Sequence, residues 1–336
     1  MIKLTELFSE SELKDWRARL EKHPEANLLQ SPEWAHVNAI KGAKVFYLPF
    51  GENDFALAIL RTARRGRYLE VPAGPIIDWH NDKTINTAFD ELKKLARSEK
   101  CGFIRFRPQL EDTPENRKKT AQSGGKLSLM HLGAQNTVFI DLKPTEDEIL
   151  ASLRRQTRYE VRQSAKKGVV VEKYTSLEMF KEFHQVQVQT AERQHFIPPN
   201  FTELEAEHEA FGENAVIYKA MSAEGEPIAY GLVLKGQTEA EYFEAASTDL
   251  GRKLPGAYAI QWQAIRDLKA EGYDRYNLFG IAPPNQPNHR YAKVTTFKTG
   301  FGEPYNFVPA HDIVISSVKY GVNRLIEAAR KKKRHL

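Results

Sequence analysis

Residues 215–245 read AVIYKAMSAEGEPIAYGLVLKGQTEAEYFEA, and within them short apolar segments alternate with polar, glycine-containing turns. Segments of this kind, rich in β-branched and aromatic residues, are typical of antiparallel strands joined by hairpins. A helical stretch at 258–270 and a strand-like segment at 275–279 follow. The stretch therefore predicts a mixed module of antiparallel strands, one helix and a further strand.

The same order of elements occurs earlier in the chain. Strand-like segments at 44–49, 55–61 and 68–71 precede a helical stretch at 84–99, which leads to a strand at 102–106. Repetition of a supersecondary unit within one chain indicates duplicated modules. We therefore predict an α/β (mixed α+β) fold made of two tandem acetyltransferase-like (GNAT) modules.

A boundary between the modules is marked near residue 145. Asp141-Leu142-Lys143-Pro144 ends a strand-like segment, and Thr145 stands three residues before Glu148. This is the spacing of a helix capping box, in which the hydroxyl and the carboxylate satisfy each other's free amides. We predict that a helix begins here and continues to Gly168.

The bulk composition is that of a soluble protein. Apolar residues make up 41% and charged residues 28% of the 336, and the longest apolar runs, such as 313–315, are far too short to cross a bilayer. The first residues lack the basic and apolar regions of a signal peptide, so we expect a cytoplasmic location. Cys101 is the one cysteine of the sequence, which excludes an internal disulfide.

The net charge of +5 indicates an anionic partner, although so small an excess also fits a solvated surface. Basic residues concentrate at 61–67, 154–167 and 330–334.

In the second of these patches Arg154, Arg158 and Arg162 recur at helical spacing with Arg155 beside them, which predicts one basic helix face. Like charges at this spacing destabilise an isolated helix, so a bound anion and a solvated helix relieved by Glu160 are both open interpretations.

The segment before the last basic patch has helical periodicity. Its apolar residues predict an amphipathic helix and are Val318, Val322, Leu325, Ile326 and Ala329. Cations at the C-terminal end of a helix suit its dipole whatever the function.

Several catalytic and cofactor motifs are absent from the sequence. It has no G-x-S-x-G elbow, no H-E-x-x-H and no P-loop, and His289 and His311 have no partner at ligand spacing, so we expect no metal. In the second module, the turn at which an acetyltransferase would bind the coenzyme A pyrophosphate has Pro255 in place of an amide donor. We expect no coenzyme A and no other cofactor.

Five short segments carry a further pattern. They are Gln30-Ser31-Pro32-Glu33-Trp34, Pro72-Ala73-Gly74-Pro75, Thr157-Arg158-Tyr159-Glu160-Val161-Arg162, Tyr276-Asn277-Leu278-Phe279-Gly280-Ile281 and, after Tyr291, Phe297-Lys298-Thr299-Gly300-Phe301-Gly302. In this order they resemble the FemABX family of peptidoglycan bridge aminoacyltransferases. The resemblance runs from about residue 28 to about residue 318.

The resemblance implies two tandem GNAT modules with a C-terminal helix that returns to the first. It implies a first domain of residues 1–144 plus 317–336, a second domain of residues 145–316, and a monomer. About twenty residues separate Arg193 from Val216, so the long helical arm of the larger members is missing. The chain is most similar to the armless FemX form, whose acceptor is a UDP-linked muramoyl pentapeptide.

The resemblance also implies roles for particular side chains. Lys298 corresponds to the ammonium that stabilises the oxyanion of the transition state, and Phe297 to the residue that packs against the terminal adenosine of the tRNA. Arg193 corresponds to the arginine that binds the phosphates of the precursor, and Tyr242 to a substrate-facing tyrosine. For each of these residues, an ordinary structural role is the alternative.

The chain departs from the family at one phosphate-binding position. Asn38 stands where a lysine is usual, and Lys41, one helical turn farther, is the candidate to replace it. Arg105 and Arg107 alternate on a strand and could line the substrate cleft. Arg155, Arg158 and Arg162 are the candidates to bind tRNA. The sequence offers no clear general base, because Asp78, Glu244 and Asp249 qualify only by type.

We predict from this resemblance a transferase that moves alanine, serine or glycine from aminoacyl-tRNA to the stem-peptide amine of a UDP-MurNAc-pentapeptide-type precursor. Two alternatives stay open: an acyl-CoA-dependent N-acyltransferase of a cell-surface sugar precursor, and a non-catalytic RNA-binding protein. The turn at Pro255, which lacks an amide donor for a pyrophosphate, opposes the first alternative. The absence of a recognisable RNA-binding motif opposes the second.

Overall fold

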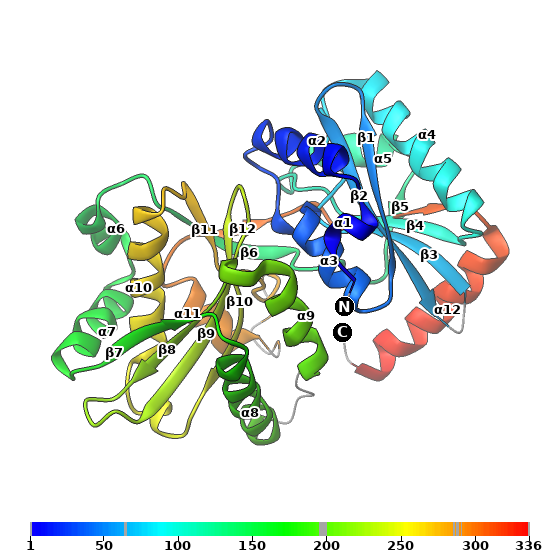
Figure 1. Cartoon of the computed structure of the whole chain (residues 1–336). Coiled ribbons are helices and arrows are strands. Elements are labelled where there is room, and N and C mark those ends of the chain that lie inside the picture. Colours follow the sequence, from blue (N-terminus) through cyan, green and yellow to red (C-terminus); the bar gives the residue numbers. More distant parts are fainter. Residues whose placement is uncertain are drawn as a thin grey trace. The chain divides into compact units, whose positions relative to one another are not determined.

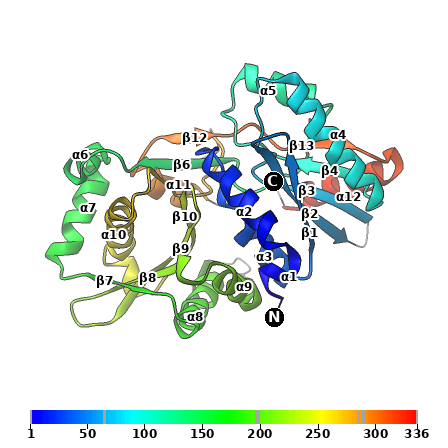
Figure 2. The same ribbon diagram turned by 45° about the horizontal axis from the view of Figure 1, so that its top comes forward.

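A computed structural model of the chain describes residues 2–63, 66–194, 200–284, 286, 289 and 291–334, without the side chains of 193, 194 and 332–334. The chain divides into two compact units. Unit 1 comprises Met1–Gln135 and Asn306–Leu336, and unit 2 comprises Asn136–Tyr305. Each unit is a sheet with helices packed on it (Figures 1 and 2). Within the described residues, no helix combines the length and the apolar character needed to cross a bilayer.

Unit 1 is built on a six-stranded sheet with the order β1-β2-β3-β4-β13-β5. Its strands are β1 (Lys44–Phe50), β2 (Asp54–Ala63), β3 (Gly66–Val71), β4 (Phe103–Phe106), β5 (Lys126–Leu127) and β13 (His311–Val314). Its helices are α1 (Leu4–Leu7), α2 (Glu10–Glu21), η1 (Leu28–Gln30), α3 (Pro32–Ile40), α4 (Asp82–Ser98), α5 (Pro114–Gln122) and α12 (Ser317–Arg334).

Strand β2 shows why helices cover both faces of this sheet. Successive side chains of a strand point to opposite faces. Phe55, Leu57 and Ile59 pack in one core cluster with Trp16 of α2. Their neighbours in the strand, Ala56, Ala58 and Leu60, belong to a second cluster with residues of α4. A continuous apolar run therefore forms a strand that is buried on both sides.

Unit 2 is built on a seven-stranded sheet with the order β12-β6-β11-β10-β9-β8-β7. Its strands are β6 (Asn136–Asp141), β7 (Val170–Tyr174), β8 (Ala215–Met221), β9 (Pro227–Lys235), β10 (Ala240–Ser247), β11 (Arg275–Asn277) and β12 (Pro304–Asn306). Its helices are α6 (Glu146–Ser152), α7 (Arg155–Lys166), α8 (Leu177–Gln194), α9 (Phe201–Phe211), η2 (Gly212–Asn214), η3 (Leu250–Arg252), α10 (Gly256–Ala270) and α11 (Ala292–Lys298).

Helices α10 and α8 cover opposite faces of this sheet. Tyr218 of β8 packs in a core cluster with Ile260 and Ala264 of α10. The next residue, Lys219, points the other way and forms an ion pair with Glu182 of α8 at 2.8 Å. The figures show the same separation, with α10 and α8 on either side of the strands.

The predicted duplication is confirmed. In unit 1 the strands β1, β2 and β3 are antiparallel, and β4 pairs with β3 in parallel after helix α4. In unit 2 the strands β8, β9 and β10 are antiparallel, and β11 pairs with β10 in parallel after helix α10. In both sheets the strand after the helix gains a further antiparallel neighbour, β13 or β6. The mixed fold of two GNAT-like modules is therefore present.

The limits of the two compact units differ from the predicted domain limits of 144/145 and 316/317. Strand β6 pairs with β11, so the second unit already begins at Asn136. Strand β13 pairs with β4, so the chain has returned to the first unit by Asn306. The sequence marks where helices begin, but it does not show which sheet a connecting strand joins.

The predicted continuous helix from Thr145 to Gly168 is wrong, because two helices occupy this segment. The capping box of Thr145 and Glu148 is present and starts α6. Leu153 and Arg154 then adopt extended backbone, with ψ angles of 145° and 141°. The side chain of Leu153 is buried. Arg154 therefore precedes α7, and only Arg155, Arg158 and Arg162 of the basic face belong to that helix.

Helix α12 is attached to the first sheet by a buried ionic network. Arg105 of β4 donates through Nε and Nη2 to the two oxygens of Asp312, at 2.7 and 2.8 Å. The same guanidinium donates to both carboxylate oxygens of Glu327 in α12, at 3.0 Å each. Burial lowers the pKa of Arg105, but its hydrogen bonds to the two carboxylates outweigh burial and raise it. The C-terminal helix thus packs on the first unit.

We expect Arg105→Leu to lower the free energy of unfolding by about 3–5 kcal/mol, because two buried carboxylates would lose their common cation. Urea denaturation would measure the change. Arg117 provides a matched control, since it also binds an aspartate, Asp112, through two nitrogens but is 60% exposed. Arg117→Leu should change stability by less than about 1 kcal/mol. Equal effects of the two substitutions would contradict a structural role for the buried network.

Candidate functional site

Lys298, the last residue of α11, is a buried amine. The residue is only 8% exposed. Its Nζ donates to the carbonyl oxygen of Gly280 at 3.0 Å. Nζ also lies 5.7 Å from the centre of the Tyr242 ring, a cation–π distance. Burial lowers the pKa of Lys298 to about 8, and the negative charge of Glu241 partly opposes this effect. A lysine of this kind is charged at neutral pH in a poorly hydrated place.

The carbonyl that holds Lys298 follows an unusual backbone conformation. Phe279 has a φ of +57°, a value that side chains other than glycine rarely adopt. A side-chain oxygen, Asn277 Oδ1, accepts the Phe279 amide at 2.9 Å and the Thr137 hydroxyl at 2.5 Å. Asn277 Nδ2 in turn donates to Glu241 at 3.0 Å. Three neighbouring strands, β6, β11 and β10, thereby fix the turn that presents the Gly280 carbonyl.

Tyr242 is buried beside Lys298. Burial raises the pKa of its phenol, and the side chain of Gln261 in α10 partly opposes this effect. A Cβ atom on Gly231 of the neighbouring strand would lie 2.6 Å from the tyrosine ring, so the glycine provides the space that the ring fills. The register of β9 and β10 shifts between Tyr242 and Glu244. Such bulges redirect side chains next to functional sites.

Phe297 is half-buried and lies in an aromatic cluster of unit 2. Its ring centre is 5.0 Å from that of Tyr258 and 5.3 Å from that of Phe301. These protein contacts orient the ring. The contact with adenosine expected from the resemblance stays a prediction.

The start of the basic helix α7 lies against the segment that carries Lys298. The Arg154 amide donates to the Gly300 carbonyl at 3.0 Å, and Arg154 Nη2 donates to the Thr296 carbonyl at 2.7 Å. A Cβ atom on Gly300 would lie 2.1 Å from Thr157 Oγ1, so this close approach requires glycine. Three of the family-like segments, at 157–162, 276–281 and 297–302, therefore meet at one place.

The remaining two family-like segments meet in unit 1. The side chain of Gln30 donates to the Pro72 carbonyl at 2.5 Å and accepts the Leu57 amide at 2.8 Å. A Cβ atom on Gly74 would lie 2.7 Å from the Gln30 side chain. The buried side-chain amide of Gln30 therefore packs the segment 30–34 against the segment 72–75.

Most of the substrate-binding candidates of unit 1 are buried and hydrogen-bonded within the protein. Asn38 is 2% exposed, and its amide donates to the Trp34 carbonyl within α3 at 2.8 Å, whereas Lys41 is exposed just after that helix. Arg107 is buried and donates to the Leu132 carbonyl at 2.8 Å. Given the ionic network described above, we propose structural roles for Arg105 and Arg107 in place of substrate binding. The side chain of Arg193 lies outside the described residues.

Sequence reasoning missed Glu241, Asn277 and Thr137. All three are buried, at 0%, 2% and 1% exposure, although they are polar. Asn277 stands inside a family-like segment and Glu241 beside Tyr242, so a polar residue in the middle of a buried strand was the available signal. Their mutual contacts join strands far apart in the sequence, which no local pattern reveals.

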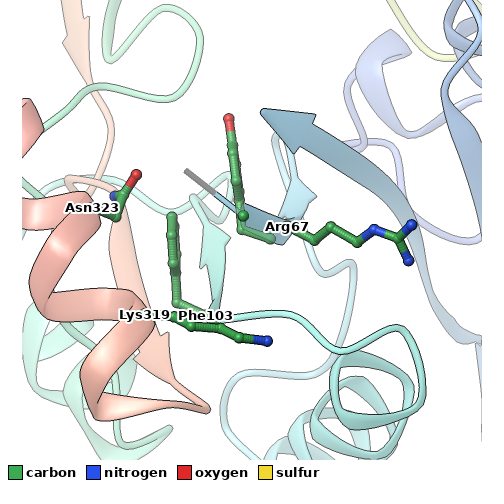
Figure 3. Close-up of a pocket in the computed structure, with 7 residues that line it drawn as sticks. Arg67, Phe103, Lys319 and Asn323 are labelled. Atoms are coloured by element: carbon green, nitrogen blue, oxygen red, sulfur yellow. The ribbon is translucent and has the colours of Figure 1, made fainter. Parts of the chain in front are cut away.

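The structure also has a small hollow in unit 1, away from these residues in the chain. It is lined by Gly66, Arg67, Tyr68, Gly102, Phe103, Lys319 and Asn323. Figure 3 shows Lys319 and Asn323 coming from helix α12 and the Arg67 guanidinium pointing away from the others. In the part of the chain that the structure describes, no group of histidine, cysteine and carboxylate side chains could hold a metal ion.

Comparison with known proteins identifies the family. The model of the FemAB family matches residues 9–221 and 199–328. The chain belongs to the FemAB family. A curated relative, the lipid II:glycine glycyltransferase of Staphylococcus aureus, is 26% identical over 212 residues, which cover 59% of this chain and 50% of the relative. The chain thus spans about half the length of the curated relatives it matches.

Solved structures show the same fold. The crystal structure of FemX has a TM-score of 0.83 at 16% identity and covers 94% of this chain and 98% of that one. A tandem GNAT protein of the clavulanic acid pathway has a TM-score of 0.56 at 10% identity, covering 92% and 96%. At these identities the likeness concerns the fold alone.

We expect Lys298→Met to stabilise the protein by about 1–2 kcal/mol at pH 7, because the buried charge disappears, although the Gly280 carbonyl loses its donor. Below about pH 8 the lysine is protonated in both the folded and the unfolded chain, so the folded state bears the full desolvation penalty. Between pH 8 and the ordinary value of 10.5 the folded chain loses its proton first, so wild-type stability rises and the advantage of the variant shrinks.

Urea denaturation of both proteins between pH 7 and pH 10 would measure this difference. Lys293, exposed on the same helix, gives the control substitution Lys293→Met, for which we expect no such pH dependence. A destabilised Lys298→Met protein at pH 7 would show that the ammonium is not under a desolvation penalty.

Proposed function

We propose that this FemAB-family protein transfers an amino acid from aminoacyl-tRNA to the stem-peptide amine of a peptidoglycan precursor. One observation carries the proposal: a buried, hydrogen-bonded lysine ammonium stands beside the start of a basic helix. The family membership supports a peptidoglycan substrate. The name of the Staphylococcus aureus relative mentions lipid II and glycine, which supports a muropeptide acceptor and a small amino acid such as glycine, alanine or serine.

The proposed reaction needs an electrostatic catalyst more than a nucleophilic one. The stem-peptide amine attacks the carbonyl carbon of the ester that joins the amino acid to the tRNA ribose. A C–N bond forms, the C–O bond to the ribose breaks, and the proton lost by the amine is balanced by the proton gained by the ribose hydroxyl. Since the ester is already activated, no covalent enzyme intermediate is required.

Lys298 fits the requirement for a charge that stabilises the oxyanion. An ammonium in a site with little water acts on a developing negative charge more strongly than it would in solution. Its hydrogen bond to Gly280 and the strands behind that turn hold it in place before the reaction, so little reorganisation is needed. We assign no general base, because none of the carboxylates described near Lys298 has a geometry that requires that role.

The basic helix fits the tRNA donor. Arg155 and Arg162 are exposed on α7, and Arg158 Nη1 donates to the carbonyls of Ala151 and Leu153 at the end of α6, at 2.6 and 3.2 Å. Arg154 and Gly300 connect the start of this helix to the Lys298 segment. An acceptor stem bound along α7 would therefore bring its 3′ end near the ammonium. Phe297 remains the candidate to pack against the terminal adenosine.

The precursor is assigned to Arg193, Lys41 and Tyr242 only by resemblance. Tyr242 is buried, so we propose that it acts on substrate through Lys298 and not by direct contact. A transfer assay that supplies both UDP-linked and lipid-linked precursors would show which one is the acceptor.

The packing of the second-module turn supports tRNA over coenzyme A as the donor. Pro255 precedes α10 and supplies no amide, and a Cβ atom on Gly251 would lie 1.8 Å from the Ile228 carbonyl oxygen. The turn is therefore pressed against strand β9. A pyrophosphate would need free amides at this helix start.

We expect Lys298→Met to lower turnover roughly a hundredfold or more while precursor binding stays near normal, the usual result of losing a charge that acts only in the transition state. Transfer of labelled amino acids from a pool of charged tRNAs to UDP-linked and lipid-linked muropeptides would measure it. Wild-type turnover should also fall as the pH rises through about 8, where Lys298 loses its charge. Lys293→Met is the control, and an active Lys298→Met protein would refute the assignment.

We expect Arg155→Gln, Arg158→Gln and Arg162→Gln together to weaken tRNA binding and to flatten its salt dependence by roughly two to three in the slope of log K against log salt. Filter binding at several salt concentrations would measure this. The control removes three exposed lysines of unit 1, Lys14→Gln, Lys22→Gln and Lys118→Gln, and changes the net charge equally. If the two triple variants behave alike, α7 acts only through the overall charge.

A further inference from the structure

Helix α12 exposes the apolar side chains that its sequence pattern would be expected to bury. Val318, Val322 and Leu325 are 78%, 49% and 74% exposed. Their spacing of four and three residues places them in one stripe along the helix, which exposed Ala329 continues. The face packed on the sheet instead carries Tyr320, Asn323 and Glu327, which lie half a turn away. The stripe therefore points directly away from unit 1.

The orientation of the helix is fixed by its buried face. Glu327 accepts from Arg105, and the Tyr320 hydroxyl donates to Asp312 at 3.2 Å. A Cβ atom on Gly102 would lie 2.9 Å from Lys319 Cβ, so the helix also lies close against the segment before β4. Figure 3 shows Lys319 and Asn323 on this helix with Phe103 of that strand. Rotating the helix to bury its valines would break the buried ion pair between Glu327 and Arg105 and the hydrogen bond from Tyr320 to Asp312.

The side chains that α12 presents to solvent carry only positive charge among the described residues. Its one acidic residue, Glu327, forms an ion pair with Arg105. Its cations are Lys319, Arg324, Arg330, Lys331, Lys332, Lys333 and Arg334. The four cations whose side chains are described are all exposed. At about 100° per residue, Lys319 and Arg330 lie roughly a quarter turn from the centre of the apolar stripe on one side. Arg324 and Lys331 lie on the other side, farther from the stripe and nearer the packed face, and their exposed side chains are long.

We propose that α12 is a docking surface for an anionic lipid bilayer. The apolar stripe would enter the boundary between headgroups and acyl chains, and the flanking cations would meet lipid phosphates. Long basic side chains reach the headgroup level while their stems cover apolar surface. The inference goes beyond the proposed function, because it needs neither charged tRNA nor precursor.

The composition of the surface favours a bilayer over two other partners. Nucleic acid would meet the cations, but valine and leucine between them would contribute no phosphate contact and no base stacking. A second copy of the chain, paired through the same face, would place cations against cations, because a twofold interface uses the same patch on both subunits. A bilayer alone matches the apolar stripe and the positive flanks together.

Flotation of the full chain with lipid vesicles tests the proposal. We expect binding to vesicles of equal parts phosphatidylglycerol and phosphatidylcholine, and much weaker binding to phosphatidylcholine alone. Val318→Ser, Val322→Ser and Leu325→Ser together should lower the partition coefficient roughly 30- to 100-fold. The matched control replaces three exposed apolar residues elsewhere, Ile2→Ser, Leu127→Ser and Val170→Ser, and should bind like the wild type.

The charges are tested separately. Arg324→Gln, Arg330→Gln and Lys331→Gln together should lower binding to the anionic vesicles roughly tenfold to a hundredfold. The lysine control triple at 14, 22 and 118 should have a much smaller effect. All substituted residues are exposed, so thermal unfolding of every variant should match the wild type.

Four results would overturn the proposal. The wild-type chain could fail to bind the anionic vesicles, or the serine variant could bind them as well as the wild type does. Analytical ultracentrifugation could reveal a dimer that the serine variant abolishes, which would assign the stripe to a second copy. If instead uncharged tRNA binding depends on the α12 cations while vesicle binding does not, the surface serves RNA.

Discussion

The burial of the Lys298 ammonium, hydrogen-bonded to the Gly280 carbonyl, is the constraint on which the candidate site of unit 2 depends. Burying an ammonium carries a large desolvation penalty unless polar groups surround it. Here the carbonyl, the face of Tyr242 and the charge of Glu241 provide that surrounding. The carbonyl is available only because Phe279 adopts a left-handed conformation, which Asn277 and Thr137 hold from neighbouring strands. Strain and buried polar groups thus coincide at one place, as they often do at functional sites.

The two units share a topology, but the pKa of the buried cation is raised in unit 1 and lowered in unit 2. Arg105 in unit 1 is neutralised by two carboxylates within hydrogen-bond distance, and its pKa is raised. Lys298 in unit 2 has a carbonyl and a carboxylate that acts at longer range, and its pKa is lowered. A satisfied cation contributes to structure, whereas an incompletely satisfied one retains a field that can act on a substrate. Duplication of the fold therefore did not duplicate the chemistry.

Buried ionic contacts also determine how helix α12 is oriented. Because its polar face is fixed by Arg105 and Asp312, its apolar residues are displayed to solvent instead of being buried. One face of the helix therefore binds the sheet, and the opposite face exposes apolar side chains to solvent. A periodic apolar pattern identified the helix correctly but did not show which face packs on the sheet, since the ionic network decides that.

The sequence by itself determined the order of strands and helices, the duplication, the capping box of Thr145 and the family, because these depend on periodicity, local hydrogen bonding and short motifs. It also indicated Lys298 as a candidate, through its place in a family-like segment. Tertiary structure alone decided that Lys298 is buried, that Arg105 faces two carboxylates, that β6 and β13 belong to the sheets they join, and that the helix after Thr145 breaks at Leu153 and Arg154. The physical reason is common to all four. Burial, ion pairing and strand pairing are contacts between segments far apart in the chain, and their energies depend on distances that local sequence does not encode.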